Sequence, residues 1–169
     1  SAASDVYKRQ VVKLMDYRPD IKIVDATLRD GGLVNNFRFT DEFVKDLYQT
    51  NIKAGVDVME FGYKADKEMF DVKDFGKWKF CDDEDIRAVV GDNNTDLKIA
   101  VMADVGRCNY KQDIKPRAES PVDVIRVATY INQIPSAIDV IEDAVAKGYE
   151  VTCNITVSYT HLRAHEPSQ

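Results

Sequence analysis

The alternation of short β-rich segments with helical patterns constrains the fold of this chain most. Apolar runs rich in valine and isoleucine indicate five buried strands, at residues 22–27, 56–62, 97–103, 124–130 and 150–155. The segments between them predict helices from Thr40 or Asp41 to about Ala54, over 85–90, and from about Pro135 to Gly148. Strands that alternate with helices form βαβ units, so the sequence predicts an α/β protein with a parallel sheet.

Two α/β architectures fit this alternation: an open doubly wound sheet and a (β/α)₈ TIM barrel. Neither nucleotide-binding fingerprint, G-x-G-x-x-G or G-x-x-x-x-G-K-[ST], follows the first strand. A whole barrel needs about 250 residues. We therefore expect residues 11–155 to form a partial (β/α)₈ TIM barrel of about the first five βα units. The helix faces expected to pack inward carry Phe43, Leu47 and Ile52 in one helix, and Ile138, Ile141 and Val145 in another.

The charge and cysteine content exclude several classes of protein. A net charge of −6 argues against a nucleic-acid partner and an anionic membrane surface. No apolar run approaches the roughly 20 residues that span a bilayer, and no segment is typical of a signal peptide. The three cysteines are scattered and form no C-x-x-C pair, so neither a disulfide framework nor a structural zinc site is indicated. A cytoplasmic location is expected.

The two ends of the chain carry related and unusual sequences. Back-translation of DVYKRQ at residues 5–10, read on the opposite strand in a shifted frame, gives the VSYTH of residues 157–161. This inverted repeat resembles the transposon-end adapter of sequencing libraries; the alternative is a coincidence between two exposed tails. We expect residues 1–10 and 156–169 to be translated adapter sequence, which is excluded from fold reasoning. His161 and His165 then belong to the adapter, and residues 11–155 contain no histidine.

The first candidate site is the pair Arg29 and Asp30, directly after the first predicted strand. Active sites of parallel α/β proteins lie at the carboxyl ends of the strands. A carboxylate such as Asp30 is a hard oxygen ligand for Mg²⁺ or Mn²⁺. A guanidinium such as Arg29 can stabilise a developing oxyanion. The alternative interpretation is a surface ion pair or a helix cap.

The second candidate is Glu60, within the apolar strand sequence VMEFG. A buried carboxylate requires a cationic partner, and Arg29 on the neighbouring strand end is the obvious candidate. The alternative is an outward-facing, solvated glutamate.

The motif D-x-T-L-R-D-G at residues 25–31, with a glutamate at the end of the next strand, resembles the metal-dependent TIM-barrel lyases and aldolases. That superfamily has a pyruvate carboxyltransferase domain and includes HMG-CoA lyase and the 4-hydroxy-2-oxovalerate aldolases. The last of these are closest in pattern, because residues 125–129 (IRVAT) resemble their fourth strand. The resemblance implies a carbon–carbon lyase or condensing enzyme that acts on a 2-oxo acid or acyl substrate.

The same resemblance implies roles for three residues. Asp30 matches a ligand of the divalent metal. The expected ion is Mn²⁺ or Mg²⁺, and Zn²⁺ or Co²⁺ is the alternative. Arg29 matches the arginine that stabilises the enolate oxygen, and Glu60 matches the glutamate that holds that arginine. Leu33 departs from the aldolase pattern, because the aldolases carry a histidine there. The H-x-H metal ligands of the family are expected beyond Ile155.

Several expectations remain open at this point. The parent enzyme is expected to be a homo-oligomer, and five strands alone to be inactive and prone to aggregation because their sheet edges are unpaired. A barrel without catalytic activity, used as a binding or regulatory module, is the alternative function. The connection at 63–83 is either a lid over the catalytic face or a surface excursion that packs its aromatic residues on neighbouring helices.

Overall fold

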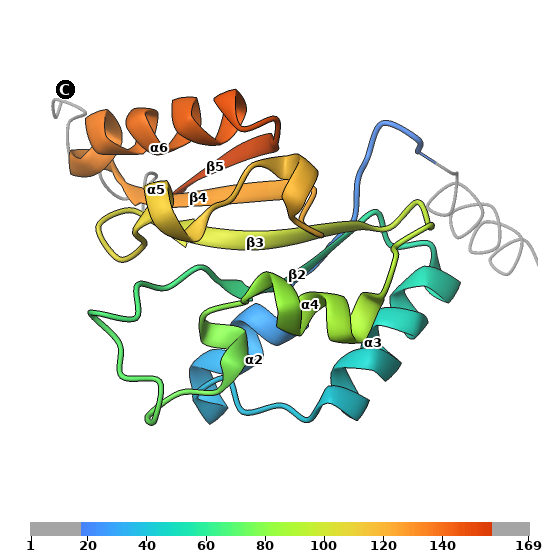
Figure 1. Cartoon of the computed structure of the whole chain (residues 1–169). Helices are drawn as coiled ribbons and strands as arrows, with labels where there is room; N and C mark the ends of the chain where they lie inside the picture. The colour runs from blue at the N-terminus through green and yellow to red at the C-terminus, as the bar shows by residue number, and fades with distance from the viewer. Residues whose placement is uncertain (1–17, 157–169) are drawn as a thin grey trace, which may run out of the picture.

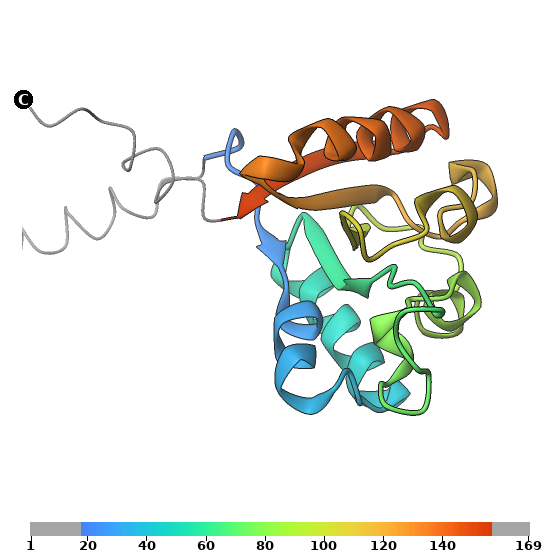
Figure 2. The same cartoon turned by 90° about the vertical axis from the view of Figure 1, so that its left-hand side faces the viewer.

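A computed structural model describes residues 18–156 as an α/β structure with one parallel sheet. The sheet curls like half of a barrel (Figure 2). The predicted adapter segments at 1–10 and 156–169 lie outside the described residues, except for Thr156, which ends β5. The strands are β1 (Val24–Asp25), β2 (Val58–Tyr63), β3 (Lys98–Asp104), β4 (Val124–Tyr130) and β5 (Glu150–Thr156), and they follow one another across the sheet in chain order (Figure 1).

The helices connect successive strands, as the alternation predicted. They are α2 (Thr27–Asn35), α3 (Asp41–Ala54), α4 (Asp83–Val90), α5 (Tyr110–Asp113) and α6 (Ile134–Ala146), with 3₁₀ turns η1 (Lys77–Lys79), η2 (Arg117–Glu119) and η3 (Ile131–Gln133). The predicted ends of α3 are confirmed: the Thr40 hydroxyl accepts a hydrogen bond from the Phe43 amide, and Gly55 ends the helix at a φ of 71°. No helix among residues 18–156 has the length and apolarity to cross a bilayer.

The two faces of the sheet differ in chemistry. Ile99, Val101, Ile125 and Val127 belong to the hydrophobic core shared with the helices. Because side chains alternate along a strand, Lys98, Met102, Asp104, Val124 and Arg126 point to the opposite face. The amino-end part of that face lines a cavity of about 810 Å³, together with the end of α3 and the loop before β3. All five strands contribute to it, through Val24, Val58, Lys98, Val124, Arg126 and Thr152.

Two sequence predictions about helix faces are right only in part: Leu47, Ile52 and Ile141 pack against the core, but Phe43, Ile138 and Val145 do not. In α6, Ile138 is 47% exposed and Val145 is 56% exposed, whereas Ala137, Val140 and Ala144 are buried. The small alanines let the helix approach the sheet closely, so the larger aliphatic side chains face away from it. In α3, the buried residues are Val44, Tyr48 and Asn51, and Phe43 is exposed.

The first predicted strand is also longer than the observed one. Residues 22–27 were expected to be extended, but β1 covers only two residues and α2 begins at Thr27. The side chain of Asp25 explains the early turn. It accepts a hydrogen bond from the Thr27 hydroxyl at 2.5 Å and another from Asn51 of α3 at 2.9 Å. The motif that follows β1 is therefore the first turns of a helix and not an open loop.

Candidate active site

Arg29, which follows the carboxyl end of β1, meets Glu60 in the middle of β2. Arg29 lies in the first turn of α2 and Glu60 in β2, and Nε of Arg29 donates to Oε2 of Glu60 at 2.9 Å. Glu60 is fully buried. The solvated-glutamate interpretation is therefore wrong, and Arg29 is the cationic partner that the sequence predicted for this carboxylate. Burial acts to lower the pKa of Arg29, but the hydrogen bond and charge of Glu60 outweigh it and raise the pKa.

Arg126 of β4 completes a group of three charged residues and was not identified from the sequence. Its Nη1 donates to the same Oε2 of Glu60 at 2.6 Å. The available signal was strand alternation, because Arg126 stands between Ile125 and Val127, which face the core. Two guanidiniums thus converge on one carboxylate oxygen. The trio carries one net positive charge in a largely buried position.

The second oxygen of Glu60 has no partner. Oε1 is enclosed and no hydrogen bond reaches it from the residues that the structure describes. A buried carboxylate oxygen without a donor is costly, so this atom favours a water molecule or a ligand group that donates a hydrogen bond.

Tyr63 and Asp104 stand at the ends of β2 and β3 and extend the site. A bulge between Glu60 and Tyr63 turns Tyr63 to the face that Met102 shares, and Tyr63 lies close enough to Arg29 to feel its charge. Burial raises the pKa of Tyr63, and the charge of Arg29 opposes that rise. Burial likewise raises the pKa of Asp104, against the charges of Arg107 and Lys79. Neither residue was identified from the sequence.

Asp30 offers a single accessible carboxylate next to this group. Its side chain is 61% exposed and pairs with Nη1 of Arg29. Its hard, exposed oxygens suit one position in the coordination shell of Mg²⁺ or Mn²⁺. Among residues 18–156, however, no cluster of three histidine, cysteine, aspartate or glutamate side chains could hold a metal ion. Asp30 therefore fits as one ligand, and the described residues do not form a complete metal site.

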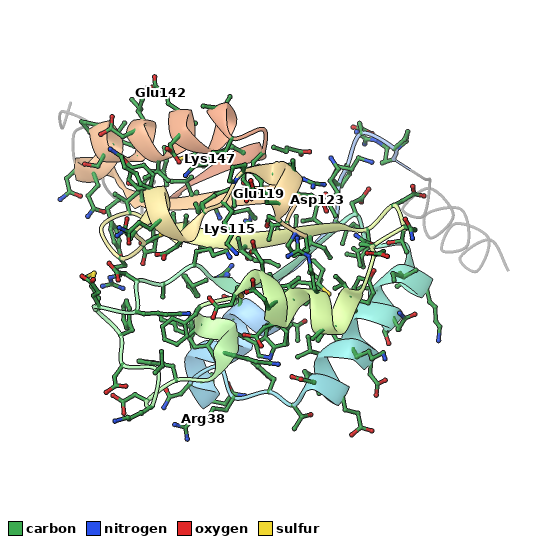
Figure 3. The ribbon with its side chains drawn as sticks, viewed as in Figure 1. Arg38, Lys115, Glu119, Asp123, Glu142 and Lys147 are labelled. Atoms are coloured by element: carbon green, nitrogen blue, oxygen red, sulfur yellow. The ribbon has the colours of Figure 1, made fainter. Side chains whose placement is uncertain are left out.

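The connection between β2 and α4 packs closely on the fold. Trp78 and Phe80 are buried, and the Trp78 ring lies 5.6 Å from that of Phe61. Nη2 of Arg38, labelled in Figure 3, donates to the carbonyl oxygens of residues 73 and 74 at 3.1 and 3.2 Å. These contacts favour the interpretation in which the segment packs its aromatic residues on its surroundings.

Comparison with known proteins supports an aldolase-like family. No protein-family model matches the chain. It is 30% identical over 118 residues to 4-hydroxy-2-oxovalerate aldolase 6 of Rhodococcus jostii, a match that covers 70% of this chain and 32% of that protein. It is 27% identical over 143 residues to 4-hydroxy-2-oxovalerate aldolase of Pelotomaculum thermopropionicum, covering 84% and 41%. The chain thus spans about a third of the length of the first relative and about two fifths of the second. Their names support an aldolase-type lyase in broad terms.

Proposed function

We propose that this chain is the N-terminal part of a divalent-metal-dependent carbon–carbon lyase, or of a condensing enzyme that runs the reaction in reverse. Its substrate is a 2-oxo acid or an acyl compound that reacts through an enolate. The observation that carries the proposal is the meeting of two guanidiniums, those of Arg29 and Arg126, on the buried carboxylate of Glu60 beside the carboxyl end of β1. The aldolase names of the relatives support the same reaction class.

In this proposal Arg29 acts on the oxygen that gains negative charge. When the carbon–carbon bond breaks, its electron pair passes to the 2-oxo group as an enolate, and the hydroxyl on the departing fragment loses a proton to become a carbonyl. The Nε–H of Arg29 donates to Glu60, and other N–H groups of the guanidinium can donate to that oxygen. Glu60 fixes the guanidinium, so the donors are in position before the charge develops.

Asp30 is the proposed metal ligand on this chain. The proposed ion is Mn²⁺ or Mg²⁺, with Zn²⁺ or Co²⁺ as the alternative. A bound divalent ion supplies Lewis acidity to a substrate oxygen. Its remaining protein ligands come from outside the described residues. Asp30 itself contributes an exposed carboxylate and pairs with Arg29, which brings the ligand and the oxyanion donor to one place.

The test is Arg29→Ala in the full-length protein, measured as metal-dependent exchange of the C3 protons of a 2-oxo acid in D₂O by NMR. Loss of one oxyanion donor lowers the rate about 100- to 1,000-fold. Arg29→Lys is expected to recover only part of it, because an ammonium lacks the planar fork. Arg18→Ala, in an exposed pair with Asp20, is the control. An unchanged exchange rate in Arg29→Ala overturns the assigned role.

A non-catalytic binding module is the second candidate, and Leu33 favours it. This side chain is exposed on α2 at the position where the resembling aldolases have a histidine. A module binds the 2-oxo acid without exchanging its protons. Binding by calorimetry with no exchange above the metal-only rate therefore supports the module over the enzyme.

A further inference from the structure

The side chain of Lys79 lies among four aromatic rings. Its Nζ is 4.4 Å from the ring centroid of Phe70, 4.7 Å from Tyr63, 5.1 Å from Phe37 and 5.5 Å from Phe75. The residue is 9% exposed. These rings come from the end of β2, the turn after α2 and the connection that follows β2. Four rings from three separate segments thus hold one ammonium group in place.

The ammonium of Lys79 keeps its hydrogen-bond donors unused. Within residues 18–156, no carboxylate or carbonyl oxygen accepts a hydrogen bond from its Nζ. The buried Lys64 differs, because its Nζ donates to Asp83 at 2.8 Å and to the Cys81 carbonyl at 2.7 Å. Ring faces stabilise a cation without accepting its hydrogen bonds. Moreover, Nζ of Lys79 is not among the fully enclosed polar atoms that lack a partner, so its tip remains accessible.

A second cation stands near this amine. The charge of Arg107 lowers the pKa of Lys79, after the larger effect of burial, and Asp104 acts in the opposite direction. Arg107 pairs with Asp104 at 3.5 Å and is itself largely exposed. Lys79 and Arg107 lie on neighbouring segments, since their backbone carbonyls accept hydrogen bonds from the adjacent amides of Ala65 and Asp66. Of these two cations, Arg107 alone is paired with a carboxylate among residues 18–156, an arrangement that favours a further anion. Tyr63 connects this place to the candidate active site, since its ring contacts Lys79 and it ends β2, the strand that carries Glu60.

We propose that Lys79 and Arg107 form a subsite for a second anionic group of the substrate, a carboxylate or a phosphate, while the 2-oxo end lies at Arg29. This rests on the proposed function and narrows the substrate class to 2-oxo acids that carry a second anionic group. The four aromatic rings around Lys79 orient its ammonium group. The ligand supplies the acceptor oxygens that the described part of the protein does not. Asp104 limits the subsite to one anion by its own charge.

The first experiment measures anion binding at the subsite and requires no catalytic turnover. The full chain is labelled at lysine amines with a trace of acetic anhydride at pH 8, with or without inorganic phosphate or succinate, and each lysine is quantified by peptide mass spectrometry. A bound anion shields Lys79 and favours its protonated form, so its labelling slows several-fold while that of the exposed Lys53 does not change. Equal slowing of both lysines, or of neither, overturns the subsite. Protection by phosphate alone or by succinate alone assigns the chemical source.

The second experiment uses the full-length protein with a monoanionic and a dianionic 2-oxo acid, 2-oxobutyrate and 2-oxoglutarate. Lys79→Met is expected to raise KM for the dianion about tenfold or more and to leave that for the monoanion unchanged. Lys79→Arg is expected to recover most of the loss. If phosphate protects Lys79 but no 2-oxo acid exchanges protons, the proposed function fails and the subsite stands. If exchange occurs and Lys79→Met changes KM by the same factor for both acids, the subsite proposal is wrong.

Discussion

Arg126 and Glu60 are joined across an intervening strand: Nη1 of Arg126 on β4 lies 2.6 Å from Oε2 of Glu60 on β2, with β3 between them. Arg29 reaches the same oxygen from α2. One carboxylate thus ties together three elements that are distant in sequence. Its loss should therefore affect the fold and the site together.

Glu60→Gln is expected to lower the free energy of unfolding by about 3 kcal/mol or more, because it leaves two guanidiniums, 18% and 16% exposed, without their counter-charge. Urea denaturation measures this. Glu42→Gln, exposed at the start of α3, is the matched control and should change stability by less than about 0.5 kcal/mol. Equal stabilities of the two variants would contradict the role of the trio.

The buried pair of Lys64 and Asp83 gives a second prediction. Lys64→Met leaves the Asp83 carboxylate buried, with Oδ2 already unpartnered, and should cost about 3 kcal/mol or more. Adding Asp83→Asn should recover part of that loss, since the buried charge disappears. Lys67→Met breaks the neighbouring surface pair with Asp82 and should cost at most about 1 kcal/mol. Similar losses in Lys64→Met and Lys67→Met would show that the first pair is not buried.

Gly62 in β2 is required by close contact with the backbone of η1. A Cβ at this position would overlap the carbonyl oxygen of Trp78, which cannot move without displacing the turn. Gly62→Ala should therefore cost about 2 kcal/mol or more in thermal or urea unfolding. Gly31→Ala in α2 meets only the tip of the Phe39 ring at 3.3 Å and gains helix propensity, so it should be near neutral. The prediction is wrong if the two variants unfold alike.

The three cysteines should react with iodoacetamide in a set order at pH 8. Cys153 is exposed on β5 and should be modified first. Burial raises the pKa of Cys108 to about 12 and raises that of the fully buried Cys81 further, so the reactive thiolate is scarce at both. Mass spectrometry over time gives the order, and urea should remove the differences. Modification of Cys81 before Cys153 in the native chain would contradict this burial pattern.

Lys79 should leave a signature in the pH dependence of stability. Burial lowers its pKa in the folded chain, so between that pKa and the ordinary 10.5 the unfolded chain binds more protons. The contribution of Lys79 to the free energy of unfolding therefore rises with pH over that window. The difference in unfolding free energy between the wild type and Lys79→Met should increase from pH 7.5 to pH 10. A difference that stays flat or falls with pH is inconsistent with a desolvated amine.

Sequence patterns gave the order of the elements because strand and helix periods are local properties. The bounds of β4 were predicted without error, and α3 was predicted from its cap and its terminal glycine. The early start of α2 was missed, because it depends on a hydrogen bond from Asn51 of α3 to Asp25. The buried face of α6 was missed because close helix–sheet approach selected alanines over larger aliphatic residues.

The candidate site, too, was predicted from the sequence only in part. Arg29, Asp30 and Glu60 belong to a motif and its partner strand, so the sequence singled them out, although their catalytic and metal-binding roles remain proposals. Arg126 becomes part of the site only because the curled sheet lets it reach over β3 to Glu60. The environment of Lys79 likewise depends on rings from three segments that only the folded chain brings together.

The strand order has a consequence for how the chain is made. Each strand pairs with the one that precedes it in sequence, so every step of sheet growth uses a partner that the ribosome has already released. No strand must wait for a distant segment before it finds its place. The chain can therefore assemble in the order of its synthesis, one βα unit at a time. Within residues 18–156, β5 has a strand neighbour on one side alone, so its other edge keeps backbone groups that a further strand could pair with.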